Sequence, residues 1–397
     1  MSGGAHMVNA TSGDMAVHYC YTGSVPLVQS VASRSLSTFG QNPVQLGHIL
    51  LRIAFANNDG TSFGLAVQQS LFAFSSAHQH SDYMRGSEHK IAALEALSAI
   101  SGSEIDVTEA VQHVAAGMLL CSYEMQYSSC TTGHWLSYLI GIQDIIRVTG
   151  LDTIYGHPDL IMLLDWVYYY NVLARFSRQH WHRKEFAGVQ LSPMRPPHRE
   201  EASKARLVSP IAASRLAYLE LLSEMCDGAI APVPPGEPSR DKEEHQNYLK
   251  ILDWKIRSLP ATPSCDSEAD SEAKLELYRL AMLIYLNRAS RNVLGQAARM
   301  LQQVDQGYAI LSSLAFCDQQ FPVFMLGCEA RSDGEREAVL GLIQRTEEHG
   351  TCRAFNYVKR LLEALWTQKD LAFGRDLTYW DQLSDVMSRC VVLPTFV

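Results

Sequence analysis

The chain lacks the cysteine spacing that would hold a structural zinc ion. Its nine cysteines stand at scattered positions, and none forms a C-x-x-C pair. Tetrahedral zinc sites draw their ligands from short local turns, so this spacing supplies no such site. An odd number of scattered cysteines is typical of a reducing, intracellular compartment. We therefore expect no metal cofactor in this chain.

Long apolar runs and an excess of positive charge are missing as well. The most apolar segment, residues 160–176, carries Asp165 in its middle and does not reach the roughly 18 unbroken apolar residues typical of a membrane span. With 33 basic and 42 acidic residues the net charge is −9, which gives no general attraction to phosphate. We expect neither a membrane span nor DNA binding by this chain alone.

Apolar residues make up 47% of the 397 positions, enough to bury a large core. The opening MSGGAHM, residues 1–7, lacks the basic and apolar regions of a signal peptide and resembles the remnant of an expression tag. We exclude it from the fold. Residues 8–40 are assigned to a partly ordered N-terminal extension, and residues 41–397 to the folded domain. The native sequence upstream of residue 8 stays an open question.

Helix signals recur along most of the chain. Asp106 and Glu109 match a capping box, and apolar residues then recur at helical spacing. A second helix follows and ends at Gly150, a typical C-terminal cap. Together they predict a helical hairpin. Its buried faces are predicted to contain Val107, Val111, Val114, Met118, Met125, Trp135, Leu139, Ile142 and Ile146.

A second hairpin is predicted near the end of the chain. Ser332 and Glu335 form another capping box, and the helix they open runs to Gly350. The next segment carries one apolar face along a further helix. The residues of that face are Phe355, Val358, Leu362 and Trp366.

Strand signals are scarce, because no stretch alternates apolar and polar residues for long between turn signals. The fold class is therefore predicted as all-α, a single large helical-bundle domain of antiparallel helical hairpins. Three inserts rich in proline, serine and charge interrupt it near residues 189–210, 228–243 and 257–273. These inserts could instead separate two domains, and that alternative stays open.

Two segments offer weak signals of nucleophilic catalysis. GTSFG at 60–64 matches the G-x-S-x-G elbow with Ser62 as nucleophile, but the elbow needs a strand before it and a polar loop stands there. Cys328 in FPVFMLGCEA has no histidine nearer in sequence than His349 to activate it. We predict a loop leading into a helix for Ser62, and a short buried helix with Pro322 in its first turn for Cys328.

Two histidine pairs raise the question of a metal site. His78 with His80, and His180 with His182, are each two residues apart, which points them to nearly opposite sides of a helix. Neither pair can chelate one ion. The second pair lies in RFSRQHWHRK, which we expect to be a solvated basic helix end, with a partner-binding patch as the alternative.

An aromatic helix is the strongest ligand-site signal. Tyr168, Tyr169 and Tyr170 are consecutive and span more than half of a helix circumference. We expect some of them to face a cavity, a partner or solvent, since a tyrosine suits a pocket wall with its apolar body and polar tip. Ordinary core packing is the competing interpretation.

Five segments, in order, resemble one protein family. LAVQQSLFAFSSAHQH with EHKIAALEAL comes first, then LLCSYEM at 119–125, GHWLSYLIGIQDII at 133–146, YRLAMLIYLNRAS at 278–290 and FPVFMLGCEARSDGEREAVL at 321–340. This order resembles the fungal-specific transcription factor domain found C-terminal to zinc binuclear cluster DNA-binding domains, of the type that includes sterol-sensing regulators. The similarity covers most of the chain. Phe321 stands where the family pattern has tryptophan.

The resemblance implies an all-helical regulatory module of a factor controlling transcription by RNA polymerase II. It implies a nuclear location, with shuttling to the cytoplasm left open, and a homodimer that contacts co-regulators or the transcription machinery. Some members bind a small-molecule effector. Zinc and DNA contacts would belong only to a DNA-binding segment absent from this sequence.

The first functional hypothesis is therefore an effector-sensing domain, in which a small apolar metabolite selects one arrangement of the helices. The alternative is a protein-interaction and dimerisation scaffold without a ligand, and an enzyme of unknown class is the third. The family shares no set of ligand residues, so the predicted ligand-binding residues rest on aromatic character alone. They are Trp135, Trp166, Tyr169, Tyr170 and Phe324.

Overall fold

The structure is a computed structural model that describes residues 39, 43–55, 62–78, 83–99, 105–126, 133–154, 157–181, 191–194, 210–227, 239–260, 269–349, 355–371 and 379–397. Throughout these residues the regular structure is helical and no strand occurs, which confirms the predicted all-α class. Of the predicted tag remnant and the N-terminal extension, only Phe39 belongs to this described part.

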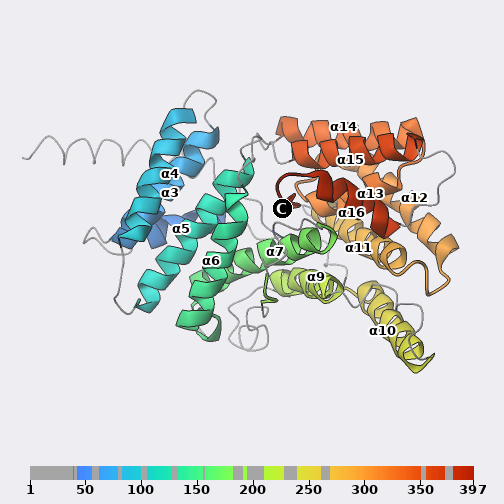
Figure 1. The fold of residues 1–397 in the computed structure, drawn as a ribbon, viewed down its shortest axis with the longest axis horizontal. Coiled ribbons are helices and arrows are strands. Elements are labelled where there is room, and N and C mark those ends of the chain that lie inside the picture. Colours follow the sequence, from blue (N-terminus) through green and yellow to red (C-terminus); the bar gives the residue numbers. More distant parts are fainter. Residues whose placement is uncertain are drawn as a thin grey trace, which may run out of the picture.

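Three groups of helices make up the fold (Figure 1). The N-terminal bundle consists of α2 (Pro43–Ala54), α3 (Ser62–His78), α4 (Tyr83–Ser98), α5 (Val107–Gln126) and α6 (His134–Thr149), followed by the short 3-10 helix η1 (Leu151–Thr153). The middle of the chain forms α7 (Pro158–His180), α9 (Pro210–Cys226) and α10 (Ser239–Arg257). The C-terminal bundle consists of α11 (Ala269–Ala289), α12 (Ala297–Ser313), α13 (Gln320–Glu329), α14 (Asp333–His349), α15 (Phe355–Leu371) and α16 (Tyr379–Arg389).

The helix α7 connects the two bundles. It packs against α2, α5 and α6 of the N-terminal bundle, against α9, and against α16 of the C-terminal bundle. Figure 1 shows it near the centre of the molecule, with α9 alongside and α10 reaching outward. A helix contacted on so many sides buries its whole circumference, and residues 163–177 of α7 are all buried, the polar Asp165, Asn171 and Arg175 included.

The local helix signals in the sequence are confirmed. The backbone N–H of Glu109 donates to Oδ1 of Asp106 at 2.8 Å, while the N–H of Asp106 donates to Glu109 at 3.1 Å. Ser332 and Glu335 form the same reciprocal pair before α14. Gly150 ends α6 with a φ of 66°, in the left-handed region that favours glycine. The predicted starts at Asp106 and Ser332 and the predicted end at Gly150 are thus confirmed, while Gly350 lies outside the described residues.

All three tyrosines of α7 are buried, which excludes the expected solvent-facing position and supports the core-packing interpretation. Tyr168, Tyr169 and Tyr170 are at most 2% exposed, so none of them faces solvent. Each instead meets a different neighbour. Tyr169 packs its ring 5.6 Å from that of Phe39, and the Tyr170 hydroxyl lies 3.0 Å from Oγ of Ser122 in α5. Because α7 is surrounded, three consecutive aromatic residues can all enter the core.

The expected solvated end of α7 is wrong. His180 is fully buried, its Nε2 lies 2.8 Å from the Tyr285 hydroxyl, and its ring lies 4.4 Å from that of Trp380. Trp181 is 1% exposed and donates its indole N–H to the carbonyl oxygen of Cys390. The C-terminal bundle covers this helix end, which the local basic sequence could not indicate. The companion residue His182 lies outside the described residues.

Two of the three predicted inserts are shorter than expected. The helix α10 begins at Ser239, inside the insert 228–243, and α11 begins at Ala269, inside the insert 257–273. The first turns of both helices are rich in charged residues and serine, a composition that resembles that of a loop. Of the insert 189–210, the structure describes only residues 191–194 and the first residue of α9.

The short helix α13 is buried on all sides, as the packing interpretation of FPVFMLGCEA predicts. Its last carbonyl groups are satisfied by side chains from other helices. The Trp366 indole N–H donates to the carbonyl oxygen of Gly327 at 2.9 Å, and the Tyr308 hydroxyl donates to that of Leu326 at 2.9 Å. A Cβ atom at Gly327 would lie only 2.5 Å from Leu362, so glycine permits this close approach of α15.

Candidate functional site

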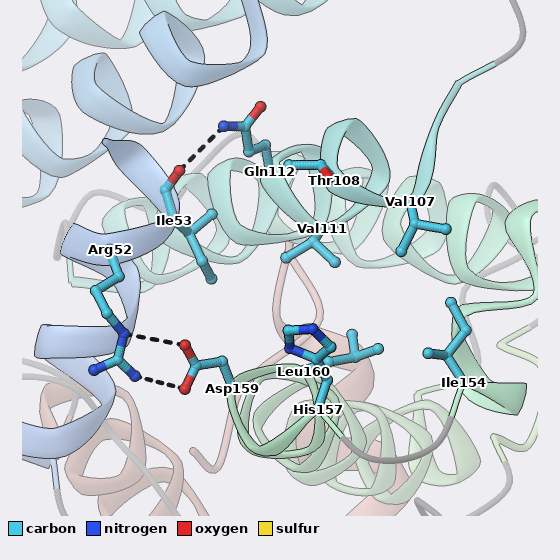
Figure 2. A pocket seen from close by; sticks show the side chains of 10 residues that line it. All are labelled: Arg52, Ile53, Val107, Thr108, Val111, Gln112, Ile154, His157, Asp159 and Leu160. Atoms are coloured by element: carbon cyan, nitrogen blue, oxygen red, sulfur yellow. Dashed lines mark hydrogen bonds and ion pairs between the residues drawn. The ribbon is translucent and has the colours of Figure 1, made fainter. Parts of the chain in front are cut away.

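A cavity of about 210 Å³ lies where α2, α5 and α7 meet. The first turns of α5 and α7 form two of its walls, and the C-terminal turn of α2 completes the rim together with Ile154 and His157 (Figure 2). The residues that line it are Arg52, Ile53, Val107, Thr108, Val111, Gln112, Ile154, His157, Asp159 and Leu160.

Local sequence fixes both helix starts. The reciprocal capping box holds the first turn of α5, so that Val107 and Val111 project from one side of it. The first turn of α7 has Pro158 at its first position, where the missing N–H costs nothing. His157 precedes it, and its carbonyl oxygen accepts the Ile161 N–H at 3.1 Å. These two turns place the walls of the cavity independently of any ligand.

The walls are mostly aliphatic. Figure 2 shows Val111 of α5 facing Leu160 of α7 across the cavity, with Val107 and Ile154 toward one end and Ile53 toward the other. Val107 is 50% exposed, so this end of the cavity is open to solvent. Leu160 is 3% exposed and forms the buried floor. An open apolar slot of this kind gains free energy when an apolar molecule replaces water in it.

One ion pair closes a side of the cavity. Arg52 donates from Nε to Oδ2 of Asp159 at 3.1 Å and from a terminal nitrogen to Oδ1 at 2.5 Å. The pair joins α2 to the first turn of α7, where an aspartate also interacts favourably with the helix dipole. Gln112 donates to the carbonyl oxygen of Ile53, and its own amide oxygen points away from the cavity in Figure 2.

The size and lining suit a small, largely apolar molecule. A dry cavity of about 150 Å³ is enough to hold benzene, whereas pockets for drug-sized ligands begin near about 300 Å³. The lining contains no serine or cysteine. Its polar groups, Thr108 and His157 with the Arg52–Asp159 pair, can orient a ligand that enters between the apolar walls.

The five predicted ligand residues are not in this cavity. Trp166, Tyr169 and Tyr170 lie together in the core, with ring centroids 5.8 Å apart for Trp166–Tyr170 and 5.9 Å for Tyr169–Tyr170. Trp135 of α6 is 1% exposed, and its carbonyl oxygen accepts from the Cys121 thiol. Phe324 is fully buried in α13, with its ring beside that of Phe396. That these residues form an effector site stays a prediction.

The weak catalytic signals receive structural explanations. Ser62 is the first residue of α3, and no strand is described anywhere near it, while residues 56–61 before it lie outside the described part. Cys328 is 1% exposed, and burial raises the pKa of its thiol to about 12, which keeps it protonated. Within the described residues no three His, Cys, Asp or Glu side chains gather as metal ligands would. Nor is any helix there both long enough and apolar enough to cross a bilayer.

One wall of the cavity was indicated by the sequence of α5. Val107 and Val111 belong to the predicted apolar face of α5. Val107 is half-exposed and Val111 is only partly buried, whereas Val114 and Met118 on the same face are fully buried. An apolar stripe that extends beyond the core at a capped helix start leaves an uncovered apolar wall. The partner wall on α7, 45 residues or more along the chain, could not be paired with it from sequence.

Comparison with known proteins defines the class of this all-helical fold. Residues 28–391 match the fungal specific transcription factor domain, so the chain belongs to that family. One relative is the curated protein named "Transcription factor iacI" from Pestalotiopsis fici, which is 40% identical over 392 residues. The alignment covers 98% of this chain and 96% of that relative. No solved structure matches the chain.

The family confirms the resemblance predicted from the five ordered segments. Together with the relative it supports a role as a transcriptional regulator, rather than as an enzyme. The family match includes the residues that line the cavity and those of α13.

Proposed function

We propose that this chain is the effector-sensing regulatory domain of a fungal factor acting on transcription by RNA polymerase II, and that the cavity between α2, α5 and α7 binds the effector. The observation that carries the proposal is the preformed apolar slot between two capped helix starts. The effector is a small molecule with an apolar body and at most one or two polar groups, which meet Thr108, His157 or the Arg52–Asp159 pair.

The position of the cavity supplies a mechanism. One wall is the first turn of α7, and the same helix packs on α9 and on α16 of the C-terminal bundle. A ligand that fits the slot best in one arrangement of α5 against α7 raises the population of that arrangement. Since α7 is continuous from the cavity to the C-terminal bundle, a small shift at its start moves surfaces far from the ligand.

Other parts of the proposal come from the family. It implies a nuclear protein that acts as a homodimer with co-regulators, and that contacts DNA through a segment carrying a zinc cluster. The competing function is a protein-interaction scaffold without a small-molecule ligand. The scaffold finds support in exposed apolar side chains on α10, Ile251 at 54% and Trp254 at 67% exposure.

A matched pair of valine variants tests the effector site. Val111→Phe places a bulky ring into the slot, whereas Val148→Phe makes the same change at an 81% exposed position near the end of α6. A reporter gene driven by the full factor is measured against a panel of small apolar metabolites. We expect a compound that changes reporter output in the wild type and in Val148→Phe, and no longer does so in Val111→Phe.

Three outcomes decide between the hypotheses. Loss of the response only in Val111→Phe, with an unchanged melting temperature, supports the cavity. If Val111→Phe is folded and responds like the wild type, the effector does not bind there. If no compound in a broad panel acts on the wild type while Trp254→Ala removes reporter activity, the scaffold function replaces the proposal.

A further inference from the structure

Residues 391–397, VVLPTFV, lie at the interface between the N-terminal and C-terminal bundles. They follow α16, form no helix, and end near the centre of the molecule between α6 and the C-terminal bundle in Figure 1. Val391 is 65% exposed, but the next residues enter the interior. The exposed fractions are 6% for Val392, 2% for Leu393, 0% for Phe396 and 5% for Val397.

Groups from three parts of the fold hold this segment. At its start, the Trp181 indole N–H at the end of α7 donates to the carbonyl oxygen of Cys390 at 3.2 Å. A Cβ atom on Gly133, just before α6, would lie 3.4 Å from a methyl group of Val392. At its end, the side-chain amide of Gln320 in α13 donates to the carbonyl oxygen of Val397. The segment therefore touches both bundles and the helix that connects them.

Phe396 is the anchor of the segment. Its ring centroid lies 5.4 Å from that of Phe176 in α7, at an interplanar angle of 73°, and 4.6 Å from that of Phe324 in α13. Phe176 also meets Phe321 at 5.0 Å, so the ring of Phe396 completes an aromatic cluster between the central helix and the C-terminal bundle. A fully buried aromatic side chain of this kind carries much of the affinity of a bound peptide.

The segment is bound as a peptide ligand is bound, by side chains in pockets and a few hydrogen bonds to main-chain oxygens. It contributes no helix that other elements depend on. Its detachment exposes four apolar side chains but restores the conformational freedom of seven residues, and these two effects oppose each other. The segment forms no helix, so its detachment breaks no helical hydrogen bond and is expected to need less free energy than opening of the helices around it.

We infer that residues 391–397 are an autoinhibitory internal ligand, seated in a peptide-binding groove made by Gly133, Phe176, Trp181, Gln320 and Phe324. While the segment is bound, it fastens α6 and α7 to α13 and holds the regulator at low activity. Its release vacates the groove and frees the bundles to move about α7. The groove lies at the opposite end of α7 from the effector cavity, so this inference does not depend on the proposed effector.

Cleavage of the folded full chain tests the groove. A specific protease sequence is inserted at the exposed Val391, the purified protein is cut, and a fluorescent VVLPTFV peptide is added. We expect the cut protein to keep its helical circular dichroism and to exchange its own segment for the labelled peptide. A peptide with Phe396→Ala should bind at least about tenfold more weakly, as loss of a buried aromatic anchor predicts, and one with Val391→Ala should bind equally well.

The opposite results overturn the inference. If release of the segment unfolds or aggregates the cut protein, or if the labelled peptide never exchanges, residues 391–397 are part of the core rather than a bound ligand. Hydrogen exchange of the uncut chain gives a second measurement that needs no variant. The amides of 391–397 should exchange at least about tenfold faster than those of α13, and equal rates would contradict a separate release step.

A reporter assay tests the inhibitory role. The full factor carrying Phe396→Ala should show basal reporter output raised by about threefold or more, because a weaker anchor increases the released population. Val391→Ala, at the exposed position, should leave the output unchanged. A folded Phe396→Ala protein, with normal exchange in α13 and unchanged or lower basal output, would show that the bound segment does not inhibit. The Val111→Phe variant tests the effector cavity and the Phe396→Ala variant tests the bound segment, so either proposal can fail without the other.

Discussion

Arg52 and Asp159 form a two-pronged ion pair although 107 residues separate them in the sequence. The pair ties the end of α2 to the first turn of α7 and closes one side of the apolar cavity. It is solvent-accessible, since the Arg52 side chain is 61% exposed and that of Asp159 is 30% exposed. The contact is therefore weak as a source of stability but well placed to influence how the two helices sit around a ligand.

Removal of this pair should change the response to the effector more than it changes the stability of the protein. In Arg52→Ala we expect the free energy of unfolding to fall by less than about 1 kcal/mol, as for other exposed pairs. The half-maximal effector concentration in the reporter assay should rise about two- to fivefold, equivalent to about 0.4–1 kcal/mol. Arg147→Ala, which breaks the exposed Arg147–Asp144 pair on α6, is the control and should change neither quantity. An unaltered response in Arg52→Ala would remove the pair from the site.

Glycine at 327 should be required for the packing of α13 against α15. A Cβ atom there would lie 2.5 Å from one methyl group of Leu362 and 2.7 Å from the other, and Leu362 is fully buried. Gly327→Ala should therefore lower the free energy of unfolding by about 1–3 kcal/mol. Gly141→Ala is the matched control, because nothing lies within 4 Å of its Cβ position. Alanine favours the helix over glycine, so this variant should raise the free energy of unfolding by up to about 1 kcal/mol. Urea denaturation of both variants measures the free energy of unfolding, which should fall in Gly327→Ala and rise in Gly141→Ala.

Tyr170 should contribute to stability through its hydroxyl as well as its ring. The hydroxyl lies 3.0 Å from Oγ of Ser122, and both residues are buried. Tyr170→Phe should cost about 0.5–1.5 kcal/mol, the usual net value of one hydrogen bond, and preserve the effector response. Alanine would instead cost about 3–5 kcal/mol through the cavity it leaves, and would obscure any functional effect. Thermal unfolding together with the reporter assay measures both effects. A lost response in a folded Tyr170→Phe protein would revive the aromatic core as the effector site.

Acidification should destabilise the N-terminal bundle through His113. Burial lowers the pKa of this histidine on α5 below its usual value of 6.5. The unfolded chain then binds the proton more tightly than the folded one, so stability is lost as pH falls through 6.5 toward the folded pKa. We expect the melting temperature to fall between about pH 7 and pH 5, and to fall less in His113→Gln. Burial also lowers the pKa of His245 on α10. His245→Gln should therefore reduce the pH dependence of the melting temperature in the same direction, and it serves as a second variant for comparison. Equal slopes in wild type and His113→Gln would contradict this origin.

The parts of the fold that the sequence predicted are those set by short-range physics. Capping boxes at Asp106 and Ser332, the cap at Gly150 and the 3.6-residue period of α15 all act within a few residues, and the structure has each of them. The all-α class follows from the sum of such signals. The buried helix α13 was also predicted, from its proline and its uninterrupted apolar residues.

The parts that failed depend on which elements meet in space. The end of α7 was expected in solvent because it is basic and cations are favoured at the C-terminal end of a helix, but the C-terminal bundle covers His180 with Trp380, 200 residues further along. The cavity needs the starts of α5 and α7 together, and no period or spacing in one segment encodes that pairing. The five aromatic ligand residues stay a prediction, and they were chosen for an aromatic character that also makes them good core residues.

Native mass spectrometry of the full chain against a panel of small apolar metabolites tests the central claim most directly. The account predicts a single ligand mass on the wild type and on Val148→Phe, and none on Val111→Phe, with all three proteins folded. Equal ligand retention by Val111→Phe, or no bound mass on a well-folded wild type across the whole panel, would contradict an effector site between α2, α5 and α7.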